Sequence, residues 1–306
     1  MAEQVNSALN NDEVEVLKTL SYFDIFSYPL TSKEIKDFFG GVENNNGNVD
    51  VALDSLSKKK LVFQLDNFYS LKADKNLSAK RSKGNKLAEP YLKKAKKISK
   101  FIGAFPFVRG VFISGSLSKG YMGDDADIDY FIITKPNRLW LARTLLILYK
   151  KVFLLNSRKY FCVNYFIDEN NLKIEEKNRF TATELVTLIP TYNANIFERL
   201  KQQNQWVKNY FPHHQWNSNP ETPSGKPKLL KRLLEFLLGG TIGNWLDRAA
   251  MKVTLIFWKR KFEHFTDEQF DLALKSRNYV SKHHPQNFQS QFLLKFEEKI
   301  NSFLKP

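Results

Sequence analysis

Two acidic residues and a glycine–serine turn are the residues of this chain best suited to chemistry. Gly115 and Ser116 follow one apolar run, and Asp127 and Asp129 stand directly before another. Both apolar runs predict β-strands, and side chains two apart on a strand point to the same face. Two carboxylates at that spacing can hold one or two Mg²⁺ ions, a cation that favours carboxylate and phosphate oxygens.

The turn supplies the complementary half of a phosphate site. Gly115 permits the backbone to approach a phosphate closely, and the hydroxyl of Ser116 can donate to a phosphate oxygen. If the turn opens a helix, its backbone N–H groups add further donors. The turn and the acids together predict binding of a nucleoside triphosphate and attack at its α-phosphorus.

The spacing G-S-x10-D-x-D resembles the signature of the DNA polymerase β-like nucleotidyltransferase superfamily. The strings 115–120 and 125–130 resemble those of its small bacterial members, and the resemblance covers about residues 105–170. It implies Mg²⁺ or Mn²⁺ as cofactor and an NTP as substrate.

The resemblance also implies roles for individual residues. Asp127 and Asp129 take the places of the catalytic metal ligands, and Gly115, Ser116 and Lys119 those of nucleotide-binding residues. Lys119 falls where small relatives carry a basic residue that could pair with the β- or γ-phosphate. Its alternative is a surface lysine on the first helical turn.

The superfamily usually has a third carboxylate on a later strand, and here Asn164 stands in its place. An amide oxygen can ligate a metal, but it cannot act as a general base at neutral pH. Asp168 lies four residues further on with the same strand parity, so it is the other candidate for the third ligand. The departure leaves open whether catalysis is retained.

Composition bounds the class of protein. The chain has 306 residues with 42% hydrophobic and 14% aromatic content, which predicts a globular protein with a substantial core. A net charge of +15 favours a polyanionic partner, which could be nucleic acid, a nucleotide or an anionic membrane surface. Cys162 is the only cysteine, which excludes an intramolecular disulfide and a cysteine-based zinc site. With no apolar signal segment and no run of 18 apolar residues, we expect a cytoplasmic protein without a membrane span.

The predicted fold class is α+β with a mixed sheet. Residues 1–75 predict a winged-helix-like domain with three helices and a hairpin. Thr31 and Glu34 have the form of a capping box at the start of its second helix, and Asp66 and Asn67 form the two-residue turn of its hairpin. Residues 76–103 predict a basic connecting helix with an apolar stripe. Residues 104–175 predict the nucleotidyltransferase core, and 176–306 a C-terminal domain that looks all-helical.

Two basic or helical features have open interpretations. The third helix of the winged-helix-like domain carries Asp50 and Asp54 and few basic residues before its last turn, so it fits a packing or substrate-positioning role better than DNA reading. The lysines of the helix 76–103 indicate either a solvated face or a surface that attracts a polyanion.

The leading functional prediction is transfer of an NMP from an NTP to an acceptor that the sequence does not identify. Small molecules, proteins and RNA ends are all candidates for that acceptor, and function depends on the site rather than on the fold. The alternative is a catalytically degenerate nucleotide-binding or nucleic-acid-binding regulatory protein. A third interpretation is an enzyme that adds nucleotides to RNA ends.

Overall fold

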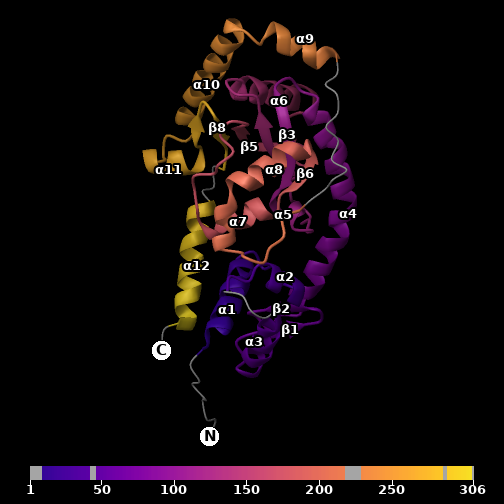
Figure 1. Ribbon diagram of the computed structural model, residues 1–306, viewed down its shortest axis with the longest axis vertical. Coiled ribbons are helices and arrows are strands. Elements are labelled where there is room, and N and C mark those ends of the chain that lie inside the picture. The colour runs from indigo at the N-terminus through magenta and orange to yellow at the C-terminus, as the bar shows by residue number, and fades with distance from the viewer. Residues whose placement is uncertain (1–8, 42–45, 218–228, 285–287, 305–306) are drawn as a thin grey trace. The chain divides into compact units, whose positions relative to one another are not determined.

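The computed structural model describes residues 9–41, 46–217, 229–284 and 288–304 (Figure 1). The chain forms two compact units that interleave along the sequence. Unit 1 comprises Met1–Lys83, Trp206–Gln215 and Ser290–Pro306, and unit 2 comprises Gly84–Gln205 and Trp216–Gln289. The C-terminal part of the chain contributes to both units.

Unit 1 contains the three helices and the hairpin that the sequence predicts. They are α1 (Asn11–Asp24), α2 (Ser32–Asp37), α3 (Asn46–Lys58), β1 (Phe63–Leu65) and β2 (Phe68–Ser70). The predicted capping box at Thr31 is present: the Thr31 side chain accepts from the Glu34 N–H, and the Glu34 carboxylate accepts from the Thr31 N–H. Helix α12 (Phe288–Leu304) adds Phe292, which stacks on Phe26.

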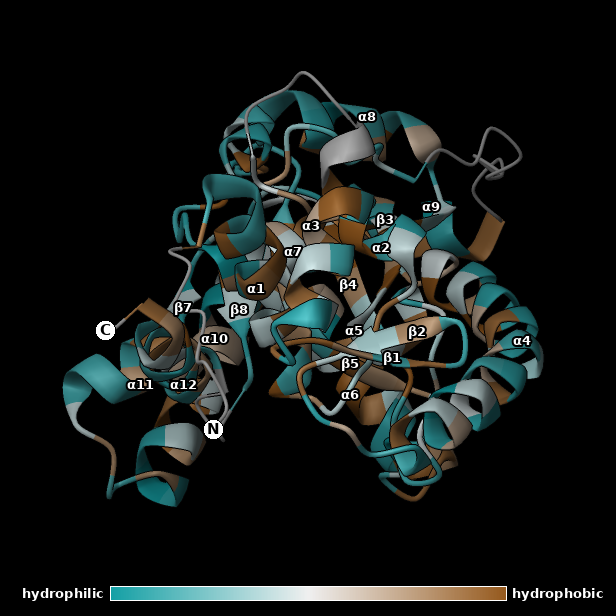
Figure 2. Ribbon diagram, turned by 90° about the horizontal axis from the view of Figure 1, so that it is seen from below, coloured by the Kyte–Doolittle hydropathy of each residue, from teal (hydrophilic) through white to brown (hydrophobic). Residues whose placement is uncertain are grey.

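Helix α4 (Asn76–Gly103) has the bounds expected of the basic helix. Its apolar stripe includes Ala88, Ala95 and Ile102, which are buried at intervals of seven residues. Hydrophilic and hydrophobic segments alternate along its ribbon (Figure 2). Most of its lysines are exposed, as expected for an amphipathic helix that packs by one stripe.

Unit 2 is built on a six-stranded mixed sheet with the order β6-β3-β4-β5-β8-β7. Strands β4 and β5 are parallel, and every other neighbouring pair is antiparallel. A parallel pair needs a crossover, which α6 (Leu139–Phe153) supplies between β4 and β5. The strands are β3 (Val108–Ser114), β4 (Asp129–Thr134), β5 (Cys162–Asp168), β6 (Ile189–Tyr192), β7 (Ser276–Arg277) and β8 (Val280–Lys282).

Both faces of the sheet are covered, because residues on opposite faces of β4 both lie in apolar surroundings. Tyr130 and Ile132 belong to the core cluster that includes residues of α4 and α6. On the other face, Phe131 stacks against Phe112, which in turn contacts Phe197 of α8. The remaining elements of unit 2 are α5 (Gly115–Ser118), α7 (Arg179–Val186), α8 (Ala194–Gln203), α9 (Leu229–Leu237), α10 (Thr241–Lys261) and α11 (Asp267–Ala273); the short helix η1 (Gln205–Asn209) follows α8.

The prediction that the C-terminal region is all-helical is wrong, because β6, β7 and β8 belong to the sheet. These strands have only two to four residues, and each comes soon after a segment with helical periodicity. They are therefore too short to show a periodicity of their own. Strand β6 contains Pro190 and lies at the sheet edge, where a residue without an N–H is tolerated. Among the described residues, no helix is both long and apolar enough to cross a membrane.

Candidate functional site

The glycine–serine turn and the second acid of the pair are neighbours in the sheet. Strand β3 ends at Ser114, which is paired with Asp129 at the start of the antiparallel strand β4. Gly115 follows with a φ of 69°, a left-handed conformation that favours glycine. A Cβ atom on Gly115 would lie 2.5 Å from Oδ2 of Asp129. The Asp129 carboxylate therefore rests directly against the backbone of the turn.

Asp127 and Asp129 share a face, as the alternation of the sequence predicts. Ile128 and Tyr130 are buried, whereas the two aspartates between and before them are partly exposed. Although β4 begins at Asp129, the backbone of Ile128 already bonds to the chain before β5: its N–H donates to the Lys159 carbonyl at 3.0 Å. The Ile128 carbonyl in turn accepts from the Cys162 N–H, and Asp127 lies close enough for its charge to act on the Asp129 carboxyl group.

The Asp129 carboxyl group lies in surroundings that disfavour its charge. Burial raises its pKa to about 6, and the nearby carboxylates of Glu184 and Asp127 act in the same direction. Hydrogen bonds from the Cys162 thiol and the Asn164 amide act against this rise. A carboxylate with a raised pKa beside other acids is typical of a functional site.

Asn164, the residue in the position of the expected third acid, contacts Asp129. Its Nδ2 donates to Asp129 Oδ1 at 2.9 Å. Tyr130 and Phe131 pair with Val163 and Tyr165 respectively, so Asn164 is the extra residue of a β-bulge. Bulges next to active sites commonly redirect a side chain, and this one presents the amide to the acid.

Asp168, the other candidate for the third ligand, lies elsewhere, and the structure does not bring it to the site. It pairs with Thr134 at the far end of the β4–β5 ladder, six residues of β5 beyond Cys162, which pairs with Asp129. The Asp168 carboxylate accepts from the Asn170 and Asn171 backbone N–H groups and from Asn171 Nδ2. The bulge at Asn164 also interrupts the alternation of side chains along β5, which was the reason to consider Asp168 as the third ligand.

Lys119 lies beside the turn but has protein partners. Its ammonium donates to Glu184 Oε1 at 2.8 Å and to the Gly115 carbonyl at 3.1 Å. Ser116, on the first turn of α5, is partly exposed. Of the predicted residues, the structure thus brings together Gly115, Ser116, Lys119, Asp127, Asp129 and Asn164.

Three residues that the sequence analysis did not assign to the site also lie there. Glu184 comes from α7 and pairs with Lys119, and Cys162 precedes Asn164 by two residues on β5. His284 follows β8; its pKa falls to about 4 through burial, and Glu184 acts against that fall. Cys162 lies two residues before Asn164 on the same strand, so the sequence could have predicted that it faces the site. Nothing in the local sequence links Glu184 or His284 to the aspartates.

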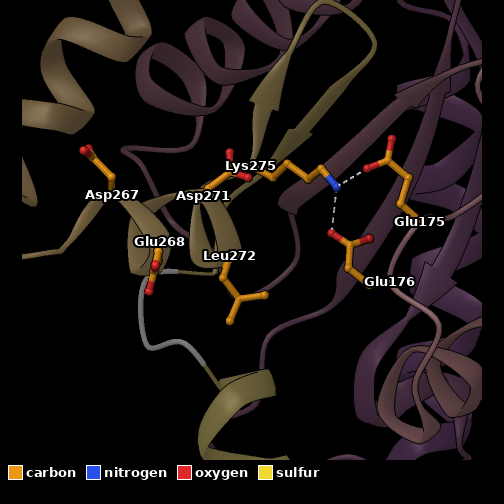
Figure 3. A pocket seen from close by; sticks show the side chains of 7 residues that line it. All are labelled: Glu175, Glu176, Asp267, Glu268, Asp271, Leu272 and Lys275. Atoms are coloured by element: carbon orange, nitrogen blue, oxygen red, sulfur yellow. Dashed lines mark hydrogen bonds and ion pairs between the residues drawn. The ribbon is translucent and has the colours of Figure 1, made fainter.

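A separate acidic hollow of about 620 Å³ lies between the segment after β5 and α11 (Figure 3). Lys275 reaches across to Glu175 and Glu176, at 2.6 and 3.0 Å. Asp267, Glu268 and Asp271 line the opposite side. Within the described part of the chain, no group of three or more histidine, cysteine, aspartate or glutamate side chains is arranged to hold a metal ion.

The arrangement around Asp129 offers a pair of carboxylates, an amide, an ammonium group and a glycine turn. Such a set can bind a cation and a phosphorylated ligand together. Comparison of the chain with protein-family models, with curated proteins and with solved structures finds no match.

Proposed function

We propose that this protein is a metal-dependent nucleotidyltransferase, which moves an NMP from an NTP to an acceptor hydroxyl or phosphate. The observation that carries the proposal is the Ser114–Asp129 pairing, which sets the Gly115 turn against one carboxylate of the Asp127–Asp129 pair. In the reaction, an acceptor oxygen bonds to the α-phosphorus. The bond to the bridging oxygen breaks, and pyrophosphate leaves.

The residues present fit a divalent cation of the magnesium type. Mg²⁺ is commonly held by one or two carboxylates together with substrate phosphates, and Asp127 and Asp129 supply that number. Burial and neighbouring acids raise the pKa of Asp129 to about 6, and a cation would relieve this unfavourable charge. When bound, Mg²⁺ or Mn²⁺ would neutralise charge that develops on the phosphates.

The chain's own side chains have distinct tasks in this proposal. Asn164 orients Asp129 through its 2.9 Å hydrogen bond, which is a positioning role. Lys119 would exchange Glu184 for a phosphate oxygen, since an ammonium group suits either anion. An acceptor hydroxyl must lose its proton to a base, and the candidates are the carboxylates of Asp127, Asp129 and Glu184, because an amide cannot accept it.

The test is Mg²⁺-dependent binding of ATP, CTP, GTP and UTP by calorimetry. We expect wild type to bind at least one of them, and Asp127→Asn/Asp129→Asn to lose affinity about 100-fold or more because both cation ligands are gone. Asp54→Asn/Glu89→Gln is the matched control, since it removes the same two charges at exposed positions. Absence of binding by wild type would overturn the proposal.

A second candidate is a nucleotide-binding protein that does not turn over. The favouring observation is that Asn164 presents its N–H to Asp129 where the superfamily usually has an acid. Release of labelled pyrophosphate with a range of acceptors distinguishes the two candidates. Binding without release by wild type, with release gained in Asn164→Asp, would favour the second.

The winged-helix-like arrangement of unit 1 remains part of the proposal, with a packing role rather than DNA reading. On α3, Asp50 accepts hydrogen bonds from Ser32 and Lys36, and Lys59 just beyond the helix pairs with the buried Glu13. These contacts use polar groups that a reading helix would offer to bases. An RNA acceptor would instead be attracted by the lysines of α4, and salt-dependent RNA retention would test that.

A further inference from the structure

Helix α9 is amphipathic, and its polar side faces the protein. The Lys231 ammonium is buried and donates to the Gly103 and Val108 carbonyls, both at 2.8 Å. Glu235 pairs with Arg109 and accepts from the Phe107 N–H at 2.7 Å. Burial of a lysine is costly unless its protons are satisfied, so these contacts fix the orientation of α9.

The apolar side of α9 therefore faces outward. Its large apolar side chains recur at intervals of three and four residues, and Phe236 is 82% exposed. Helix α10 carries a second outward stripe, where Trp245 is 68% and Phe257 67% exposed. We call the two outward stripes together the α9–α10 apolar face; they comprise Leu229, Leu230, Leu233, Phe236, Leu237, Ile242, Trp245, Val253, Ile256 and Phe257.

Polar contacts attach the turn between α9 and α10 to the rest of unit 2. The buried guanidinium of Arg138 donates to the Leu238, Gly239 and Gly240 carbonyls and to Oδ1 of Asn244. Asp247 of α10 accepts from the Leu141 N–H of α6 at 2.8 Å. Figure 1 shows α10 beside α6. The apolar face is thus held outward by specific polar contacts, and large exposed apolar patches of this kind mark interaction sites.

The charges around the face select its partner. Every exposed charged side chain of α9 and α10 is basic: Arg232, Arg248, Lys252, Lys259, Arg260 and Lys261. The two acids of these helices, Glu235 and Asp247, are used in the contacts described above. Two copies meeting through this face would bring like charges together, which disfavours self-association. An anionic lipid surface is complementary both to the apolar stripe and to its basic border.

We propose that the α9–α10 apolar face binds the surface of an anionic membrane. Helices that lie in the interface have Trp, Phe and Leu on one side and Lys and Arg on the other, and they enter the headgroup region without crossing it. Basic residues close to the surface add electrostatic attraction to anionic lipids. The proposal is independent of nucleotide chemistry, because it concerns a different surface of unit 2.

Flotation of the full-length protein with vesicles tests the proposal. We expect it to float with phosphatidylcholine vesicles that contain phosphatidylglycerol, and less with phosphatidylcholine alone. Tryptophan emission should shift to the blue on binding, and the shift should shrink in Trp245→Phe, because this ring enters the apolar region. Bound protein that shows no Trp245-dependent shift would contradict insertion of this face.

Matched variants distinguish vesicle binding through this face from vesicle binding through the net positive charge of the protein. Leu229→Ser/Leu233→Ser should weaken vesicle binding about tenfold or more, since two leucines no longer leave water. The control is Leu155→Ser/Leu294→Ser, which changes two exposed leucines, one just after α6 and one on α12. It should leave vesicle binding unchanged. Arg248→Gln/Lys252→Gln should weaken binding roughly fivefold for each charge, whereas Lys93→Gln/Lys97→Gln on α4 should not.

The remaining outcomes overturn the proposal. The two charge-removing variants, on α10 and on α4, could weaken vesicle binding equally while both leucine variants have no effect. In that case the protein is attracted to the vesicles only through its net charge. If the protein does not float but forms dimers that Leu229→Ser/Leu233→Ser dissociates, the face joins two copies. If it neither floats nor self-associates, another part of the chain or a protein partner covers the face. Circular dichroism of each variant establishes that it is folded.

Discussion

The β4–β5 strand pair carries a carboxylate near each end, and the two have opposite surroundings. Asp168 is buried and accepts three hydrogen bonds, two from backbone N–H groups and one from Asn171 Nδ2. Asp129 lies against Gly115 with other carboxylates close by, and its pKa rises to about 6. The hydrogen bonds of Asp168 come from the turn that follows it, whereas the surroundings of Asp129 disfavour its negative charge.

These opposite surroundings distinguish a structural acid, Asp168, from one that is available for function, Asp129. A carboxylate that accepts several N–H bonds of the following turn stabilises that turn. A carboxylate that burial and like charges disfavour costs stability, and such costs are concentrated at functional sites. In the sequence, both residues are simply acids that flank an apolar run.

Removal of the structural acid should have the largest effect on stability. Asp168→Ala leaves three donors without their acceptor, so we expect a loss of about 3 kcal/mol in the free energy of unfolding. Urea unfolding measures it, and Asp168→Asn should lose less because its amide oxygen still accepts. Nucleotide binding by folded Asp168→Ala should be unchanged, and a parallel loss of binding would contradict a purely structural role for Asp168.

The functional acid should have the opposite effect, and only above about pH 4. Its folded-state pKa of about 6 lies above the usual carboxyl value, so protonation favours folding. The associated stability is complete below about pH 4 and is lost as the pH rises through about 6. Asp129→Asn should therefore match wild type near pH 4 and exceed it by about 2 kcal/mol at pH 8.

Unfolding curves measured from pH 4 to pH 8 without divalent cation check this difference. Wild-type and variant stabilities that run parallel over that range would show that Asp129 is not destabilised by its surroundings. Added Mg²⁺ should stabilise wild type and not the variant, since only wild type has the charge that the cation neutralises.

The contact between Gly115 and Asp129 can be tested against a matched glycine. Gly120 also has a positive φ, of 70°, but nothing lies within 4 Å of its Cβ position. Gly120→Ala should cost about 1 kcal/mol from backbone strain alone. Gly115→Ala should cost about 2 kcal/mol and also weaken nucleotide binding, because the new methyl group displaces the Asp129 carboxylate. Equal effects of both variants on binding would refute a role for the close approach.

The Lys119–Glu184 pair should give the smallest effect. The pair is partly exposed, so Glu184→Gln should change stability by no more than about 1 kcal/mol. If Lys119 serves the nucleotide, Glu184→Gln releases it and strengthens NTP binding about threefold, and Lys119→Gln weakens it. Calorimetry on both variants decides this, and two equal losses would mean that the pair acts as a structural unit.

Local signals predicted much of the fold. The helix at 76–103 follows from its long apolar stripe, the start of α2 from the capping box at Thr31, and the hairpin from the turn at Asp66. The glycine turn and the acids were found for the same reason, because their types and spacing are properties of a short segment. The strands β6, β7 and β8 escaped because each is too short for its own pattern, and only pairing makes it a strand.

Several decisive features belong to the tertiary structure alone. The bulge that turns Asn164 towards Asp129 depends on the register between β4 and β5. The periodicity of α9 predicts a helix with two unlike sides, but not that Lys231 and Glu235 face inward. Local sequence was enough to predict the helices, the hairpin and the residues that can do chemistry, since these depend on near neighbours. Which acids meet, and which helix face remains outside, depended on partners distant along the chain, because long-range packing and hydrogen bonding override local preference.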